Sequence, residues 1–326
     1  MYKAFFNLNQ NPFEITPDPS FLFSTKKHNE ALAALYVGVR QRKGVVVLTG
    51  EVGTGKTLLV RCLLQILTRA NIAFAYVFNS RLSPMEFLQY VVADFGLPTA
   101  GKTKSELLLS LADYVINRSK QSRTTVLVVD EAHHLASEVL EEIRLLSNLE
   151  SPQQKLLQIL LIGQPELDEK LDYTDLRQLK QRIALRAQLA PLDLDEITGY
   201  IYQRLQRAGS TKPELIFPMD TILEVHHHSR GFPRLVNTLC ENGLIYAYAE
   251  QSHSVTRETI EEIAREFRLG IVHPSPAENV LGTERAAEVQ QAARAFLDLY
   301  THLRQTQSGR TDLGAFARTG KHEPYI

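Results

Sequence analysis

The sequence is poor in cysteine, in net charge and in long apolar runs, and each shortage excludes a class of protein. Cys62 and Cys240 are its only 2 cysteines, far apart and without metal-ligand spacing. We therefore expect two buried thiols in a reducing compartment rather than a disulfide framework. The 36 basic and 37 acidic residues nearly cancel, so the whole chain has no strong attraction for nucleic acid or anionic membranes. Any such partner must bind at a local patch.

Targeting and membrane-spanning segments are also missing from the sequence. The first residues lack the charged-then-apolar pattern of a signal peptide, and no apolar run approaches the roughly 18 residues that span a bilayer. No internal repeat or low-complexity tract is visible. We expect a cytoplasmic protein without membrane insertion, and its 326 residues suffice for two domains with cores of their own.

Apolar runs alternate with helical patterns through the first part of the chain. The runs GVVVLTG, IAFAYVF, VLVVD and LQILLIG read as buried strands. Because helical stretches separate them, they predict an α/β fold with a parallel, doubly wound sheet flanked by helices. The opening, MYKAFFNLNQNPFEITPDPSFLF, suits an extended arm on a domain surface, and a helix is expected over residues 27–42.

Helical patterns replace strands after about Pro191 and predict a small all-helical domain. The stretch IVHPSPAENVLG then indicates a linker, followed by an amphipathic segment from Glu284 to about Gln305 and a polar tail. We therefore predict a nucleotide-binding domain with its arm over residues 1–190, a helical lid over 191–270, and linker, C-terminal helix and tail over 271–326.

The segment GEVGTGKT satisfies the phosphate-binding pattern G-x-x-x-x-G-K-[ST] between a buried strand and a helix. Its glycines let backbone N–H groups turn towards phosphates, and the helix N-terminus adds its positive end. This predicts a P-loop NTPase that binds ATP, with Lys56 at the β and γ phosphates and the Thr57 hydroxyl on Mg²⁺. The predicted nucleotide-binding residues are Gly50, Glu51, Val52, Gly53, Thr54, Gly55, Lys56, Thr57 and Leu58.

A carboxylate pair follows the third predicted strand, in VLVVDEAHH. Because open α/β sheets bind ligands at the carboxyl ends of their strands, we expect Asp130 to hold Mg²⁺ through water and Glu131 to polarise the water that attacks the γ phosphate. A helix cap is the alternative role for such a pair. His133 and His134 are expected near the site in a helix, not as ligands. DEAH also occurs in helicases, but the other helicase sequence blocks are missing.

Further polar residues follow the carboxylate pair along the chain. Gln164 comes after the fourth strand, where its amide is expected to bridge the attacking water and the phosphate. The cluster of Arg177, Arg182 and Arg186 is either a solvated face or a phosphate-reading group, one member of which acts in trans. Arg234 stands at a helix start in SRGFPRLVN and is expected to return its guanidinium to a bound phosphate. The histidines 226–228 are expected on a helix surface.

These motifs together resemble the AAA+ module, and most closely the ExeA-type general secretion pathway ATPases. The resemblance spans about residues 1–268 through NPFEITPDPSFLF, HNEAL, GEVGTGKT, DEAHHL, LLIGQPEL, RQLKQRI, PLDLDEITGYIYQRL and GFPRLVN. It implies ATP hydrolysis at the subunit interfaces of a ring or helical filament. It also implies that Gln164 is sensor 1, Arg234 is sensor 2, and Arg182, or next Arg177, is the arginine finger.

The resemblance leaves the partner open. Secretion members continue into a membrane-spanning helix and a peptidoglycan-binding domain, and we expect neither here. Short relatives include the MuB- and TnsC-like transposition regulators, which assemble on DNA with ATP. The resemblance therefore implies a DNA-associated regulator with double-stranded DNA and a transposase or targeting protein as partners. The alternative is a secretion-type assembly ATPase that acts through protein partners.

The sequence offers few residues to separate these hypotheses. Lys102 and Lys104, before a predicted helix, are the candidate DNA contacts, although loop lysines ordinarily serve solubility. A nucleotide-binding scaffold without turnover is a third hypothesis, against which Glu131 argues. No N-K-x-D-like motif for guanine is present, and Phe13, Phe21 and His28 are proposed for the adenine pocket by analogy alone.

Overall fold

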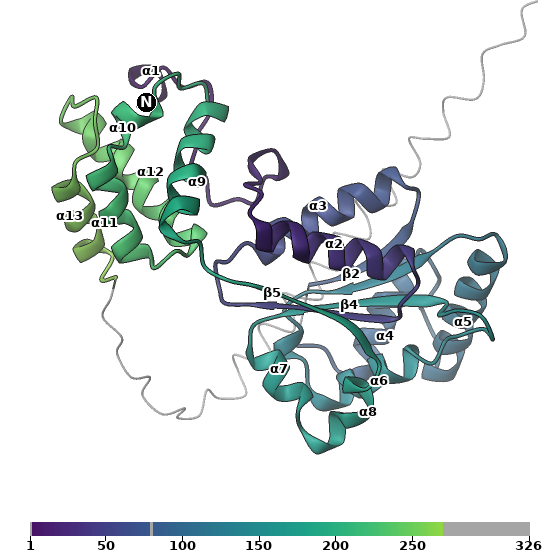
Figure 1. The fold of residues 1–326 in the computed structure, drawn as a ribbon. Helices are drawn as coiled ribbons and strands as arrows, with labels where there is room; N and C mark the ends of the chain where they lie inside the picture. The colour runs from purple at the N-terminus through teal and green to yellow at the C-terminus, as the bar shows by residue number, and fades with distance from the viewer. Residues whose placement is uncertain (1, 79–80, 270–326) are drawn as a thin grey trace, which may run out of the picture. The chain divides into compact units, whose positions relative to one another are not determined.

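The computed structural model describes residues 2–78 and 81–269 (Figure 1). The first part of the chain forms a single parallel sheet flanked by helices. The strand order is β2-β3-β4-β1-β5. The strands are β1 (Val45–Gly50), β2 (Ala73–Val77), β3 (Thr125–Val129), β4 (Leu157–Gly163) and β5 (Ile183–Leu189). The four predicted strands and the parallel sheet are confirmed.

The fifth strand, β5, is absent from the sequence prediction. It pairs with β1 at the edge of the sheet, and its residues alternate between half-buried and exposed until the buried Leu189. The exposed positions of β5 include Arg186 and Gln188, so IALRAQL lacks the continuous apolar run of the other four strands. The sequence signal for this strand was the alternation of apolar and polar residues at every second position. Arg186 therefore belongs to a strand rather than to a connection leading to the helices.

Helices cover both faces of the sheet. Side chains of α2 (Lys26–Arg40) and α3 (Lys56–Arg69) share one buried cluster with β1, β3 and β4. On the other side lie α4, α6 and α8 (Figure 1). The remaining helices of this part are α4 (Pro84–Asp94), α5 (Lys104–Lys120), α6 (Ser137–Leu146), α7 (Glu166–Leu171) and α8 (Arg177–Lys180), with the 3-10 turns η1 (Pro19–Phe21), η2 (Ala132–His134) and η3 (Thr174–Leu176).

The chain after β5 is helical, as predicted. It forms α9 (Leu194–Arg207), α10 (Pro213–Ile216), α11 (Met219–Ser229), α12 (Pro233–Ala249) and α13 (Arg257–Glu266). Asp193 and Glu196 start α9 with a capping box, in which each side chain accepts a hydrogen bond from the other residue's backbone N–H. No helix within residues 2–78 and 81–269 combines the length and apolar character needed to cross a membrane.

The N-terminal arm packs with these helices, and it is not wholly extended. It opens with the short helix α1 (Tyr2–Phe5), and Tyr2, Phe6, Leu8 and Phe13 are buried in the same hydrophobic cluster as α9 to α13. The aromatic side chains of the arm therefore supply core to the helical part. The division at residue 190 stays a prediction, and the linker, C-terminal helix and tail assigned to residues 271–326 lie outside the described residues.

Candidate nucleotide-binding site

The P-loop connects the end of β1 to the start of α3. β1 ends at Gly50 and α3 begins at Lys56, so the loop lies at the carboxyl edge of the sheet, with the N-terminus of a 14-residue helix behind it. Gly55, at the N-cap, has φ +97°, a conformation that side chains with a Cβ rarely adopt. The geometry fits an anion bound by backbone N–H groups and the positive end of a helix.

Lys56 folds back onto this loop. Its side chain is buried, and Nζ donates to the carbonyl oxygens of Gly50 at 2.7 Å and Glu51 at 3.0 Å. Burial lowers the pKa of Lys56, while the nearby carboxylates of Glu131 and Asp130 oppose that shift. A buried ammonium held by neutral carbonyls gains more from a phosphate, because hydrogen bonds between ionised partners are stronger.

The other loop residues divide into exposed and inward-facing members. Glu51 and Val52 are exposed, whereas Thr54 is buried and its hydroxyl donates to the Glu51 carbonyl at 2.8 Å. Thr57 and Leu58 are half-buried in the first turn of α3. Thr57 is therefore placed beside Lys56 with part of its surface accessible.

Asp130 follows β3, which is separated from β1 by β4, as the sequence predicted. It is 4% exposed, and burial raises the pKa of its carboxyl. Oδ2 accepts a hydrogen bond from Tyr76 Oη at 2.8 Å, and Oδ1 accepts one from the backbone N–H of Glu131 at 2.9 Å. Tyr76, on β2, was missed by sequence reasoning. The only sign of Tyr76 in the sequence was its phenolic hydroxyl group within an otherwise apolar strand.

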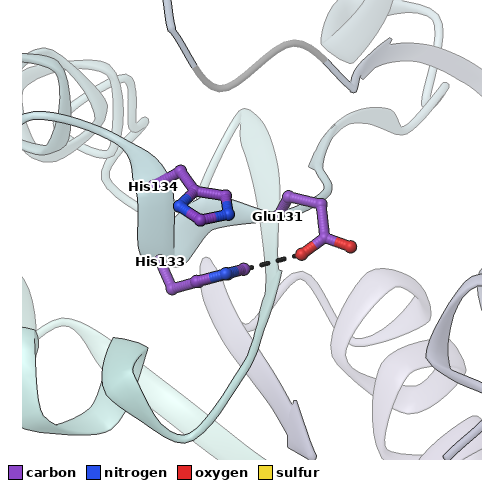
Figure 2. A group of neighbouring side chains, drawn as sticks. All are labelled: Glu131, His133 and His134. Carbon is purple, nitrogen blue, oxygen red and sulfur yellow. Dashed lines mark ion pairs between the residues drawn. The ribbon is translucent and has the colours of Figure 1, made fainter. Parts of the chain in front are cut away.

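Glu131 and Gln164 lie on either side of His133. Figure 2 shows the carboxylate of Glu131 facing the ring of His133, with Oε2 3.4 Å from Nδ1. Gln164 directly follows β4, and its Nε2 lies 2.7 Å from His133 Nε2. The structure therefore brings together two polar residues that the sequence placed after neighbouring strands. The ligand atoms of Glu131, His133 and His134 also lie within 4.8 Å of one another, a set that a metal ion could use.

Arg234 and His28 both contact the P-loop. The backbone N–H of Arg234, in the first turn of α12, donates to the Gly53 carbonyl at 3.3 Å. A Cβ at Gly53 would lie 3.0 Å from the Cβ of Arg234, so this close approach requires the glycine. His28 Nε2 lies 3.3 Å from the carbonyl oxygen of Thr54, and burial lowers the pKa of His28.

Phe13 and Phe21, which were proposed by analogy for the adenine pocket, pack against other residues. Phe13 is fully buried and packs edge-on against Phe217, with ring centroids 5.8 Å apart. Phe21 lies under the guanidinium of Arg204, 4.8 Å from ring centroid to Cζ. The assignment of Phe13 is wrong for this structure, because a side chain inside the helical core cannot line a nucleotide pocket. His28, by contrast, touches the P-loop at Thr54.

Arg182 lies at the amino ends of the strands, whereas the P-loop lies at their carboxyl ends. It immediately precedes β5, whose first residue, Ile183, is in register with Val45 at the start of β1. The 6-residue strand β1 rises roughly 20 Å from that edge to Gly50, at about 3.3 Å per residue. Arg177 is exposed at the start of α8, and Arg186 pairs with Asp168 of α7. Arg182 is therefore remote from the P-loop of its own chain.

The candidate DNA contacts already have partners within the chain. Lys102 Nζ donates to Ser110 Oγ at 2.9 Å. Lys104 is the first residue of α5 rather than a loop residue, and its ammonium pairs with Glu142, which is 7% exposed. The pairing reduces the charge that Lys104 presents to a phosphate.

The histidines of α11 were expected at the surface, but two of the three, His226 and His228, are half-buried. His227 is exposed, while His228 is half-buried and its Nε2 lies 2.9 Å from Glu224 Oε1. The Arg257 guanidinium is 3.0 Å from the other carboxylate oxygen of Glu224. Although the ligand atoms of Glu224, His227 and His228 lie close together, this cation opposes a metal ion there.

Known proteins resemble the chain in sequence and in fold. Residues 39–171 match the family described as AAA domain. The chain is 42% identical over 267 residues to General secretion pathway protein A of Aeromonas hydrophila, an alignment that covers 82% of this chain and 48% of that protein. The chain thus spans about half the length of this curated relative.

Solved structures resemble the chain at lower sequence identity. ORC2 of Aeropyrum pernix in ADPNP-ADP complexes matches with a TM-score of 0.60 at 17% identity, covering 79% of this chain and 72% of that chain. Cdc6p of Pyrobaculum aerophilum gives 0.59 at 17% over 83% and 72%, and Drosophila ORC bound to DNA gives 0.60 at 19% over 82% and 66%. At sequence identities this low, the similarity to these structures supports the fold of the chain and nothing about its function. The chain belongs to the AAA+ P-loop proteins and is related to General secretion pathway protein A.

Proposed function

We propose that the chain binds ATP with Mg²⁺, hydrolyses it, and changes its assembly state with the nucleotide. The observation that carries this proposal is the convergence of Lys56, Asp130, Glu131 and Gln164 at the carboxyl edge of one sheet, beside the N-terminus of α3. A cation, two carboxylates and an amide at a phosphate-binding loop are the groups that phosphoryl transfer to water uses.

The roles follow from chemistry and placement. Thr57 and Asp130 would hold Mg²⁺, which when bound neutralises charge on the phosphate oxygens. Lys56 exchanges its carbonyl partners for phosphate oxygens. Glu131 accepts a proton from the attacking water, and its Oε2 is buried without a hydrogen-bond partner among the described residues. Arg234 adds a positive charge beside Gly53.

Oligomerisation follows from the position of the finger candidates. Because Arg182 lies about 20 Å from the P-loop of its own chain by strand length, it acts on a phosphate only if a second subunit presents one. We therefore propose a homo-oligomer, either a ring or a helical filament, in which Arg182, or alternatively Arg177, reaches a neighbouring nucleotide.

Two partner classes remain, and different observations support them. The 42% identity to General secretion pathway protein A favours an assembly ATPase that acts through protein partners. The DNA-associated regulator, with a transposase or targeting protein, relies on Lys102 and Lys104, and the pairing of Lys104 with Glu142 weakens its support. ATP-dependent filaments on duplex DNA that weaken steeply with salt would favour the regulator; their absence at low salt would remove it.

Hydrolysis itself is tested with two substitutions. Glu131→Gln is expected to keep ATP affinity and to lower turnover at least tenfold, because the amide cannot accept the proton of water. Lys56→Ala is expected to lose ATP affinity. Calorimetry with magnesium and ATP, together with phosphate release, measures both. No binding heat from folded protein would remove the proposal, and normal turnover in Glu131→Gln would remove the role of Glu131.

A further inference from the structure

His133 contacts both Glu131 and Gln164 through its imidazole ring. It is 8% exposed and belongs to η2, directly after the β3 carboxylates. Nδ1 lies 3.4 Å from Glu131 Oε2, and Nε2 lies 2.7 Å from the amide nitrogen of Gln164 (Figure 2 shows the first contact). One imidazole therefore spans the two groups assigned to the attacking water.

The short contact determines which ring nitrogen carries the hydrogen. With the Gln164 amide oriented as in the structure, its nitrogen donates and His133 Nε2 accepts at 2.7 Å. The single hydrogen of a neutral ring then lies on Nδ1 and points towards Glu131. The backbone N–H of Gln164 also points at Nδ1 with hydrogen-bond geometry at 3.4 Å. Because a neutral ring cannot accept at both nitrogens, we assign the tautomer from the shorter of the two contacts.

The surroundings keep the ring neutral and fixed. Burial, with help from neighbouring cations, lowers the pKa of His133 to about 4. Lys170 of α7 donates to the carbonyl oxygens of His133 at 2.6 Å and Leu135 at 2.8 Å, so the backbone of η2 is held from the helix that follows Gln164. The 3.4 Å separation from Glu131 is not yet a formed hydrogen bond, as is common before substrate binds.

We propose that His133 is a positioning residue that donates Nδ1–H to Glu131 and accepts at Nε2 from Gln164, so that the two groups act on the attacking water as one unit. The inference rests on the proposed ATP hydrolysis. It adds a physical link by which a change at Gln164 reaches Glu131 through a single ring. His227 of α11 offers a matched control, because it is an exposed histidine outside this site.

The test compares His133→Ala, His133→Asn and His227→Ala in the full chain. His133→Ala is expected to lower kcat about tenfold or more, with ATP affinity within about twofold. His133→Asn should recover part of that loss, because its amide nitrogen overlies Nδ1 and can still donate to Glu131. His227→Ala should stay within about twofold of the unsubstituted protein. ATP binding, followed with a fluorescent analogue, verifies that each variant is folded.

A pair of double variants separates coupling from a general structural role. If His133 links Gln164 to Glu131, His133→Ala combined with Gln164→Ala should hydrolyse ATP about as fast as the slower single variant. Multiplied losses would mean independent action and would overturn the link. If His133→Ala does not fold, the same comparison with His133→Asn decides.

The outcomes also separate this inference from the proposed function. Normal turnover in His133→Ala, with Glu131→Gln inactive, would overturn the positioning role and leave ATP hydrolysis intact. No turnover in the unsubstituted protein, despite ATP binding, would overturn both. Equal losses in His133→Ala and His227→Ala would mean that the effect is not specific to this site and would also overturn the role of His133.

Discussion

Tyr76 donates its phenolic hydrogen to Asp130 Oδ2 at 2.8 Å, across neighbouring strands of the sheet. Because the backbone N–H of Glu131 binds the other oxygen, the carboxylate is fixed at both ends. Burial raises the pKa of Asp130, and the hydrogen bond from Tyr76 acts against that rise. The tyrosine therefore helps to keep Asp130 ionised and oriented, as a magnesium-binding carboxylate must be.

Tyr76→Phe should accordingly raise the magnesium concentration needed for half-maximal ATP hydrolysis. Losing one hydrogen bond to a charged group costs about 1.5 kcal/mol or more, which corresponds to roughly a tenfold shift. Tyr173→Phe is the control, since Tyr173 is 57% exposed. A magnesium titration of phosphate release measures the shift. If both variants give the same midpoint as the unsubstituted protein, Tyr76 has no part in metal binding.

Gly231 holds the turn that brings α12 to the P-loop. Its φ is +83°, and a Cβ there would lie 2.2 Å from the carbonyl oxygen of Leu192. Its own carbonyl accepts from the Leu192 N–H at 2.8 Å. Gly231→Ala should lower the free energy of unfolding by more than about 2 kcal/mol, because backbone must move as well as adopt a strained φ.

Gly96→Ala separates the clash from the strain. Gly96 has a similar φ of +81°, but a Cβ there would meet nothing within 4 Å. Urea denaturation should show a loss of only about 1 kcal/mol for Gly96→Ala. Equal losses for the two variants would mean that the contact with Leu192 relaxes at no cost.

The parts of the fold that the sequence predicted are those with short-range signals. The four predicted strands read as continuous apolar runs, and three of them, β1, β3 and β4, are buried along their whole length; the P-loop has a fixed spacing. β5 was missed because its exposed alternate positions include Arg186 and Gln188, which interrupt the apolar run. Tyr76 was missed because its hydrogen bond to Asp130 crosses strands that are 54 residues apart in sequence. Phe13 was misassigned because only tertiary packing reveals that the arm enters the helical core.

The pH dependence of stability should report the burial of His133. Its pKa is lowered from 6.5 to about 4 in the folded chain, so between those values the unfolded chain binds more protons. The free energy of unfolding therefore falls as the pH drops from about 6.5 to about 4. Above 6.5 the contribution of the neutral ring is complete.

Urea denaturation at pH 7 and pH 5 measures this effect against a variant. His133→Asn removes the titrating ring, so it should lose less stability between the two pH values than the unsubstituted protein. The comparison uses the difference between pH values, which removes the constant cost of the substitution. An equal loss in both proteins would show that His133 titrates normally when folded.

Lys104 is predicted to serve stability more than DNA binding. Lys104→Met leaves the nearly buried carboxylate of Glu142 without its cation, which should lower the free energy of unfolding by about 1 kcal/mol, given the partial exposure of the lysine. Adding Glu142→Gln should restore part of the loss. Lys102→Met is the control, because its partner Ser110 is uncharged.

The same variants test the DNA hypothesis. A lysine that binds a phosphate contributes nearly one unit to the slope of log affinity against log salt concentration. If Lys104→Met reduces that slope and leaves stability unchanged, the lysine contacts DNA and the structural assignment is wrong.

Arg182 is expected to act only between subunits. Arg182→Ala should retain ATP binding and lose most hydrolysis, whereas Arg186→Ala should retain activity, since Arg186 already pairs with Asp168.

Mixing Arg182→Ala with Glu131→Gln decides whether Arg182 acts on the nucleotide of a neighbouring subunit. The first variant keeps its own carboxylate and the second keeps its finger, so mixed assemblies contain some interfaces with both groups. Phosphate release by the mixture should exceed the sum of the separate proteins. If the mixture is only additive, Arg182 is not the finger; and if Arg182→Ala alone hydrolyses normally, Arg177 becomes the residue to substitute.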